Sequence, residues 1–159
     1  MSIAEGAAAP DFAMAATGGR TVSLAGQRGR PFVLYFYPRA DTPGCTKEAC
    51  AFQEALPQLG AAGVDVIGVS KDKLPALERF AAKYGLAFPL ASDGAGVAEA
   101  YGAWTEKSMY GKKHMGLDRS TVLVDAEGRV ARVWRKVKVD GHAAEVQAAA
   151  RALTATLSR

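Results

Sequence analysis

The most informative segment of the chain is Phe32-Val33-Leu34-Tyr35-Phe36-Tyr37-Pro38-Arg39-Ala40-Asp41-Thr42-Pro43-Gly44-Cys45. Its first six residues form an unbroken apolar and aromatic run, which predicts a strand buried on both faces. Thr42 suits the N-cap of a following helix, and Pro43 suits the first helical position. We therefore expect a buried strand, a short loop, and a helix that carries Cys45 in its first turn and ends near residues 60–63.

Outward from this stretch, predicted strands alternate with predicted helices. A Thr17-Gly18-Gly19 turn between residues 12–15 and 21–24 predicts an N-terminal hairpin. The later elements, in order, are a strand at 64–69, a helix at 74–84, a short strand at 86–90, a brief helix at 97–101, a hairpin of 121–124 with 130–133, and a final helix at 142–157. This order predicts an α/β fold with a central mixed sheet, in a single domain over residues 1–159.

Composition limits the possible classes of protein. The chain has 159 residues, of which 49% are hydrophobic and 23% charged, so one core needs no disulfide or metal to support it. The first ten residues lack a basic segment followed by an apolar one, and no apolar run approaches the roughly 20 residues of a membrane-spanning helix. We expect a cytoplasmic protein. The net charge is +4, but the basic residues are scattered, which argues against a nucleic-acid or membrane partner.

Cys45 and Cys50 are the only cysteines. In a reducing compartment a close pair is more often catalytic or metal-binding than a structural staple. The strand–helix order places Cys45 at the carboxyl edge of a sheet, where active sites of open α/β sheets form. Free N–H groups and the dipole of the first helical turn would favour a thiolate there. The alternative is a small apolar residue of the core, although Pro43 and Gly44 indicate a surface turn.

The spacing of the two cysteines limits their chemistry. In an intact helix, Cα atoms five residues apart are separated by about 8.6 Å, whereas a disulfide needs them within about 7 Å. Cys45 and Cys50 therefore cannot bond unless the first turn unwinds after Cys45 is oxidised; Cys50 as a packed core thiol is the alternative. For Thr42, one interpretation is that it only caps the helix, its hydroxyl accepting a bond from the Cys45 N–H.

Two other kinds of cysteine site fit the sequence less well. A zinc site would need His114 and His142 as further ligands, but the C-x₄-C spacing is wide for zinc motifs and the histidines are far apart. Thioredoxin-type redox chemistry favours C-x-x-C, which is absent.

The segment from Pro38 to Cys45 resembles the peroxiredoxin signature: a proline, three residues, a threonine, two residues and the reactive cysteine. Thr42-Pro43-Gly44-Cys45-Thr46-Lys47-Glu48-Ala49-Cys50 is similar to the PrxQ branch, also called bacterioferritin comigratory proteins. A second match is Met109-Tyr110-Gly111-Lys112-Lys113 followed by Arg119-Ser120-Thr121. The similarity extends from about Ala9 to the last helix.

This resemblance implies a thioredoxin-like fold with an N-terminal β-hairpin. It implies an atypical 2-Cys peroxidase that reduces hydrogen peroxide and organic hydroperoxides. Cys45 would be the peroxidatic cysteine, oxidised to a sulfenic acid, and Cys50 would resolve it as an intramolecular disulfide that thioredoxin reduces. No metal or other cofactor is implied, and a monomer is expected.

The resemblance also implies roles around Cys45. Thr42 would hold the peroxide through its hydroxyl, with Gly44 as a further substrate contact. Arg119 would bind substrate, support the thiolate and polarise the O–O bond, while Pro38 would shield the site from water. Glu48 would orient Arg119 or Thr42; a surface partner at i+4 spacing is the alternative.

The chain departs from the branch at three places. Gln53-Glu54 replaces a common Arg-Asp pair, Leu77 replaces a common histidine, and Tyr84 stands where some relatives place the resolving cysteine on the next helix. Cys50 is thus the remaining candidate for that role. Two functions of other classes stay open: a redox sensor that signals through the same thiol, and a basic binding module in which the cysteines are incidental.

Overall fold

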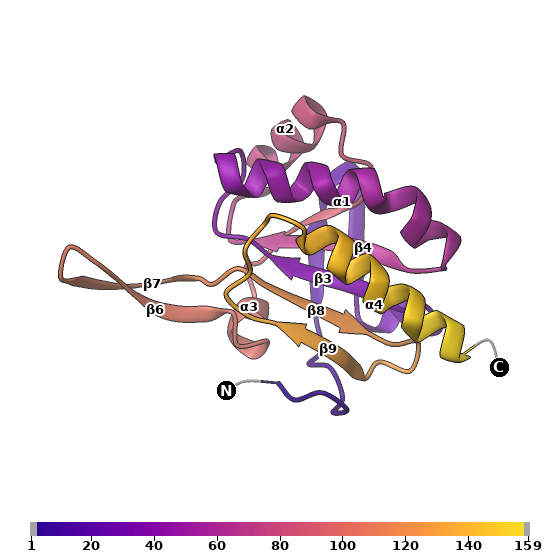
Figure 1. Cartoon of the computed structure of the whole chain (residues 1–159). Helices are drawn as coiled ribbons and strands as arrows, with labels where there is room; N and C mark the ends of the chain where they lie inside the picture. The colour runs from indigo at the N-terminus through magenta and orange to yellow at the C-terminus, as the bar shows by residue number, and fades with distance from the viewer. Residues whose placement is uncertain (1–2, 158–159) are drawn as a thin grey trace.

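The computed structural model describes residues 3–157, and its centre is a seven-stranded mixed sheet in the order β2-β1-β5-β4-β3-β8-β9 (Figure 1). β3, β4 and β5 are parallel to one another, and the remaining neighbours pair antiparallel. The strands are β1 Ala13–Ala16, β2 Arg20–Ser23, β3 Phe32–Phe36, β4 Asp65–Ser70, β5 Leu90–Ser92, β8 Ser120–Val124 and β9 Val130–Trp134. The predicted mixed sheet and N-terminal hairpin are confirmed.

Four helices cover the sheet: α1 Pro43–Ala61, α2 Leu74–Tyr84, α3 Val97–Ala100 and α4 His142–Leu157. β3 shows how the two faces divide. Val33 and Tyr35 pack with α1, α2 and α4, whereas Leu34 and Phe36 pack with α3 and the N-terminal strands. Every residue of β3 is buried, as its unbroken apolar run predicts. None of the helices among residues 3–157 is both long and apolar enough to cross a membrane.

One predicted strand has the wrong bounds. The sequence pattern predicts residues 86–90, but β5 is Leu90–Ser92. Pro89 has no N–H to donate to a neighbouring strand. Its carbonyl accepts a hydrogen bond from the Gly68 N–H of β4, at 3.1 Å. The Ala87 N–H donates to the side chain of Gln53 at 2.7 Å. The segment before Leu90 is therefore a connection that is tied to α1.

A third hairpin is absent from the sequence-based prediction. β6 Trp104–Met109 and β7 Lys112–Leu117 form a separate two-stranded sheet, which projects from the body in Figure 1. The turn uses positive φ angles at Tyr110 and Gly111, 53° and 77°. Its residues are mostly polar and do not alternate, because most of the hairpin covers no core, and so the usual strand signal is missing.

Gly68, in the middle of β4, allows the core to close beneath α1. A Cβ atom at this position would lie 2.9 Å from Leu90 and 3.0 Å from the ring and hydroxyl of Tyr35. Tyr35 in turn stacks on Phe52 of α1, with ring centroids 4.6 Å apart. The missing side chain at Gly68 therefore sets the position of an aromatic stack between the sheet and α1.

We predict that Gly68→Ala lowers the free energy of unfolding by about 1–3 kcal/mol, because the added methyl group overpacks the core. Gly60→Ala is the control, since a Cβ there meets nothing within 4 Å and alanine favours the helix. Urea unfolding followed by circular dichroism measures both. Equal stabilities of the two variants would contradict the packing argument.

Candidate active site

Cys45 lies in the first turn of α1. Thr42 is the N-cap residue, with extended backbone angles (φ −92°, ψ 157°), and Pro43 opens the helix as predicted. Backbone N–H groups of a first turn have no acceptor within the helix, and the dipole of a 19-residue helix adds positive potential at this end. The thiol is 1% exposed, so these effects act where little water competes with them.

Arg119, the residue before β8, brings a cation to Cys45 from the strand next to β3. β3 pairs antiparallel with β8 so that Phe36 lies opposite Ser120, which places Arg119 beside the loop that leads into α1. Its Nη2 donates to Cys45 Sγ at 3.3 Å, and its Nη1 donates to Glu48 Oε1 at 2.7 Å. One guanidinium thus bridges the thiol and a carboxylate. Burial opposes the charge of Arg119, but Glu48 and Cys45 outweigh it and raise the pKa of this arginine, so it stays a cation.

Gly44 leaves the space that this bridge needs. A Cβ atom at Gly44 would come within 3.2 Å of Arg119 Nη2, tighter than ordinary contacts. The structure therefore gives Gly44 a steric role beside the thiol. A direct contact of Gly44 with substrate, expected from the resemblance, stays a prediction.

Glu48 is buried against Arg119, with 2% of its side chain exposed. Burial raises the pKa of this carboxyl from 4.5 to about 7, and Arg119 opposes the rise through its charge and hydrogen bond. Within the described residues Glu48 Oε2 has no hydrogen-bond partner. Of the two expected arrangements for Glu48, the structure has the pairing with Arg119, and the surface alternative is wrong.

The Thr42 hydroxyl does not cap α1. Its Oγ1 donates to the carbonyl of Arg39 at 2.9 Å, and no side-chain capping bond is present at this helix end. The interpretation that Thr42 only accepts from the Cys45 N–H is therefore wrong. Because the hydroxyl donates backwards to Arg39, its oxygen keeps lone pairs that can accept a further hydrogen bond.

The loop that carries Thr42 is held by two aspartates. The Ala40 N–H donates to Asp72 Oδ2 at 2.7 Å. Asp41 has a positive φ of 60°, uncommon for a residue other than glycine, and accepts bonds from Lys83 at 3.0 Å and from the Tyr84 hydroxyl at 2.7 Å. The hydrogen bond from Tyr84, with that from Lys83, lowers the pKa of Asp41. α2 thus anchors the loop in place of the cysteine that some relatives carry there.

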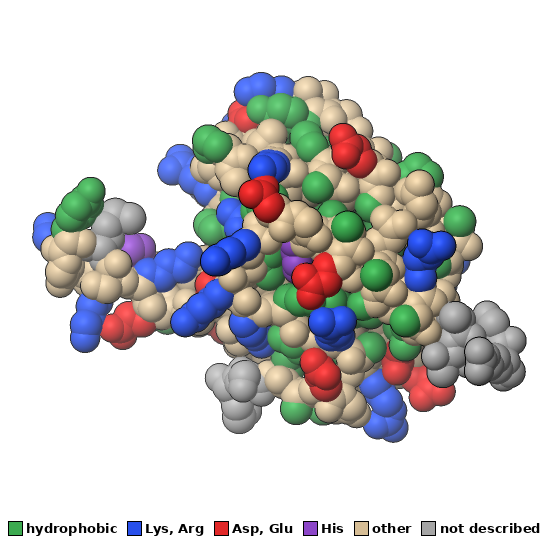
Figure 2. All heavy atoms as spheres, in the orientation of Figure 1, with side chains coloured by type: hydrophobic (Ala, Val, Ile, Leu, Met, Phe, Trp, Pro, Cys, Tyr) green, Lys and Arg blue, Asp and Glu red, His purple; other side chains and the backbone are tan. Residues whose placement is uncertain are grey.

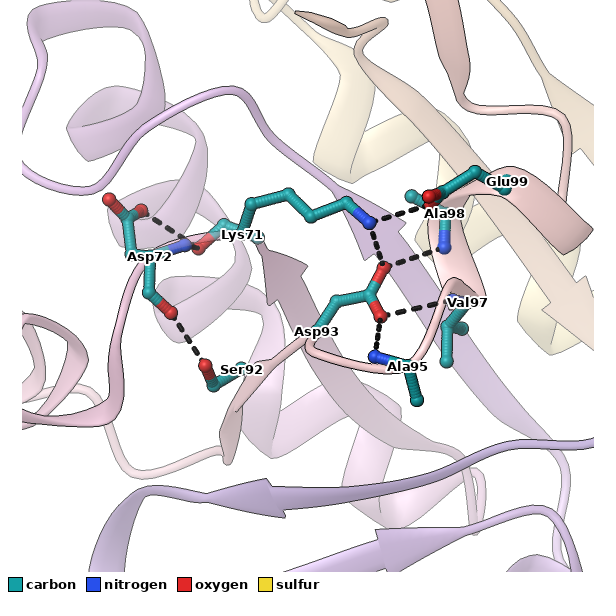
Figure 3. A network of polar contacts seen from close by, with 9 residues as sticks. Lys71, Asp72, Ser92, Asp93, Ala95, Val97, Ala98 and Glu99 are labelled. Atoms are coloured by element: carbon teal, nitrogen blue, oxygen red, sulfur yellow. Dashed lines mark hydrogen bonds and ion pairs between the residues drawn. The ribbon is translucent and has the colours of Figure 1, made fainter.

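Asp72 is itself fixed by the network in Figure 3. The Ser92 hydroxyl donates to the Asp72 carbonyl at 2.6 Å. Next to Asp72, Lys71 pairs with Asp93 at 3.1 Å and with Glu99 at 2.6 Å. Asp93 also accepts from three backbone N–H groups at the start of α3, those of Ala95, Val97 and Ala98. The ends of β4 and β5, α3 and the Cys45 loop are therefore one connected polar system, which no sequence motif had indicated.

Cys50 and Pro38 take no part in the hydrogen bonds of Arg119 with Cys45 and Glu48. Cys50 is half-buried and free, about 140° around α1 from Cys45 by helical geometry. α1 is continuous over both cysteines, so they stand too far apart for a disulfide in this conformation. Pro38 is exposed in the bend after β3. The Gln53 side chain accepts a hydrogen bond from the Ala87 N–H and so ties α1 to the segment before β5. Leu77 is a buried core residue.

The alternative zinc site does not form. His114 is exposed on β7, while His142 is buried with its Nε2 2.8 Å from Thr121 Oγ1. Among residues 3–157, no three His, Cys, Asp or Glu side chains come together as possible metal ligands.

Known proteins are similar to this chain over most of its length. The AhpC/TSA family matches residues 6–133. The bcp protein of Coxiella burnetii is 50% identical over 147 residues, 92% of this chain and 97% of the relative. Peroxiredoxin Bcp of Xanthomonas campestris is 45% identical over 147 residues, 92% of each chain.

A solved structure of the X. campestris bacterioferritin comigratory protein superimposes with a TM-score of 0.86 at 43% identity, over 90% of this chain and 92% of that one. The expected thioredoxin-like fold and the resemblance to PrxQ are thereby confirmed. The chain belongs to the AhpC/TSA family, in the Bcp/PrxQ branch of the peroxiredoxins, and is a thiol-dependent peroxidase.

Proposed function

We propose that Cys45 is the peroxidatic cysteine of this peroxidase. The observation that carries the proposal is the contact of 3.3 Å between Cys45 Sγ and Arg119 Nη2 in the first turn of α1. A thiolate there attacks the terminal oxygen of a hydroperoxide. The S–O bond forms as the O–O bond breaks, the sulfur becomes a sulfenic acid, and the leaving alkoxide or hydroxide takes up a proton.

Arg119 and Thr42 are the groups that we assign to the substrate oxygens. Negative charge moves from sulfur to the leaving oxygen during the attack, so fixed donors next to both atoms stabilise the transition state more than the ground state. The guanidinium of Arg119 already donates a hydrogen bond to the sulfur. The Thr42 hydroxyl, which donates to Arg39, has lone pairs that can accept a hydrogen bond from the peroxide O–H. We also assign to Pro38 the role of shielding the site from water, and to Gly44 that of a substrate contact beside the thiol.

We assign resolution to Cys50. Its thiol attacks the sulfenic sulfur of Cys45, the S–S bond forms, and hydroxide leaves with a proton as water. Because the two residues lie on one intact helix, α1 must unwind from its first turn. Unwinding breaks the contacts of Arg119 with Cys45 and Glu48 and the ion pair of Lys47 with Asp140. Gln53, bonded to Ala87 beyond Cys50, holds the rest of α1 in place.

The substrate and reductant follow from this chemistry. Hydrogen peroxide and alkyl hydroperoxides share the O–O–H group that the site addresses, and the X. campestris relative is described as reducing alkyl peroxides. A thioredoxin-type dithiol returns Cys45 and Cys50 to thiols. The expected compartment is therefore a reducing one, such as the cytoplasm. We propose that the chain acts as one domain and as a monomer.

Intact-mass spectrometry tests the cysteine roles. One equivalent of hydrogen peroxide should remove two hydrogens from the reduced protein within seconds, and peptide mapping should find a Cys45–Cys50 bridge. Cys45→Ser should not react at this rate. Cys50→Ser should gain oxygen at Cys45 instead, because the sulfenic acid has no resolving thiol and oxidises further. Fast oxidation of Cys45→Ser would contradict the assignment.

Arg119→Lys should lower kcat/KM for peroxide by about 100-fold, because one ammonium cannot replace a fork that contacts sulfur and carboxylate together. Arg132→Lys is the matched control, since its guanidinium is exposed on β9. Stopped-flow peroxide reduction measures both, with urea unfolding as a check of folding. A similar rate in the two variants would rule out the proposed role of Arg119.

Glu48 should make stability depend on pH. Its pKa is 4.5 without burial and about 7 in the folded protein, so the folded state binds more protons between these values. Its contribution to stability is therefore fully present below about pH 4.5 and is lost as the pH rises through about 7. Relative to Glu48→Gln, the reduced wild type should lose on the order of 3 kcal/mol of unfolding free energy between pH 4.5 and pH 8.

Urea unfolding across this pH range measures the difference between wild type and Glu48→Gln. Glu54→Gln, an exposed site on the same helix, serves as the control and should track the wild type. If the stability curves of wild type and Glu48→Gln stay parallel, Glu48 does not titrate as proposed.

A further inference from the structure

The hairpin of β6 and β7 has no evident structural task. It forms its own two-stranded sheet, and such an isolated ribbon is only marginally stable in water. At the base of the hairpin, the ammonium group of Lys107 donates a hydrogen bond to the Leu117 carbonyl. The aliphatic chain of Lys107 packs over Gly116, where an added Cβ atom would lie 3.2 Å from Lys107 Cδ. Beyond the base the hairpin leaves the body (Figure 1). A ribbon kept away from the core is available to another molecule.

The hairpin carries the exposed large hydrophobic side chains of the described residues. Tyr110, 98% exposed at the tip, and Met115, 49% exposed, are the exposed large hydrophobic side chains among the described residues. Both therefore lie on this one arm. Aromatic side chains and methionine are enriched in the centres of protein interfaces. The tip thus has the composition of a contact surface.

The hairpin is also basic. It has three lysines, Lys107, Lys112 and Lys113, and one acidic residue, Glu106. The strand register places Lys107 opposite His114 and Glu106 opposite Met115. Because directly opposed residues share a face, Lys107, Lys112 and His114 lie on a face without any acidic side chain. Figure 2 shows Lys and Arg side chains along the hairpin and on the body next to its base. A surface that binds here should be acidic.

The base of the hairpin reaches the active site. Leu117 ends β7, and Arg119, two residues later, donates to Cys45 Sγ. In Figure 1 the hairpin leaves the body on the side where α1 begins. A protein that contacts the hairpin therefore stands next to the helical turn in which the Cys45–Cys50 disulfide would form.

We propose that the β6–β7 hairpin is the docking arm for the reductant, a dithiol reductase with an acidic surface around its reactive thiol. The inference rests on the proposed function, which leaves a disulfide that another protein must reduce. The partner's thiolate attacks one sulfur of the disulfide, the S–S bond breaks, and a mixed disulfide forms. The partner's second thiol then releases it, so two electrons and two protons pass to Cys45 and Cys50.

Charge distinguishes this partner from a second copy of the chain. Two hairpins with the same basic face repel each other, whereas an acidic reductase is attracted. Complementary charge chiefly raises the association rate, and the effect weakens as salt screens it. The proposal therefore predicts a salt-sensitive rate of reduction by the protein partner, and no such effect with a small reductant.

The test uses the double variant Lys112→Glu and Lys113→Glu of the full chain, oxidised with peroxide. The probe is a thioredoxin of net negative charge, with stopped-flow fluorescence as readout. The second-order rate constant for disulfide reduction should fall about tenfold at low ionic strength, and less at high ionic strength. The control, Arg28→Glu with Arg151→Glu, makes the same change in net charge at two exposed arginines that form no ion pair with the described residues, and it should keep the wild-type rate.

Tyr110→Asn tests the apolar contact separately. Asparagine tolerates the positive φ at this turn, so the variant removes the ring and keeps the hairpin. Its rate with thioredoxin should fall at every salt concentration. Both hairpin variants should react with peroxide, and turn over with dithiothreitol, as fast as the wild type, because neither change touches the cysteine site.

The outcomes separate the two proposals. Unchanged thioredoxin rates in the hairpin variants would overturn the docking arm. The docking arm would also be overturned if light scattering showed that the wild type is a dimer and that the lysine variant is a monomer. The hairpin would then be an interface between two copies of the chain. A wild type that forms no disulfide, or fails to turn over with dithiothreitol, would instead contradict the proposed function.

Discussion

The guanidinium of Arg119 bridges Cys45 Sγ and Glu48 Oε1, and the arrangement of the site depends on this bridge. It connects the strand β8 to the first turn of α1 across the end of β3, with bonds of 2.7 and 3.3 Å. A buried cation between an acid and a thiol is stable only while both partners stay in place. Unwinding of α1 removes both at once, so the same bridge favours the folded helix before oxidation and would be lost during resolution.

The loop before α1 is held independently of that bridge. Ala40 is bonded to Asp72, and Asp41 is bonded to Lys83 and Tyr84 of α2. These contacts lie on the other side of Thr42 from Cys45, so the proposed opening of the first turn of α1 would leave them in place. The loop and the first turn therefore have separate supports, as the proposed cycle of unwinding and re-forming of α1 requires.

Much of the fold could be predicted because its signals are local. The apolar run of β3 and the Thr42-Pro43 start of α1 fix a strand–loop–helix unit without any tertiary information. Two features could not be predicted: the start of β5 and the β6–β7 hairpin. β5 starts at Leu90, after the predicted start, because Pro89 has no N–H to donate to a neighbouring strand. The β6–β7 hairpin covers little of the core, so its residues have no apolar alternation for a pattern to detect.

The amino-acid sequence alone indicates that Cys45 lies at a helix start on the carboxyl edge of a buried strand and, through the family motif, that the chain resembles a peroxiredoxin. Those properties follow from residues adjacent along the chain. Three further properties appear only in the folded chain: Glu48 pairs with Arg119, the Thr42 hydroxyl donates to Arg39, and α2 anchors the active-site loop. Each of the long-range contacts joins residues more than 40 positions apart, and their distance is set by sheet register and helix packing, which no local pattern encodes.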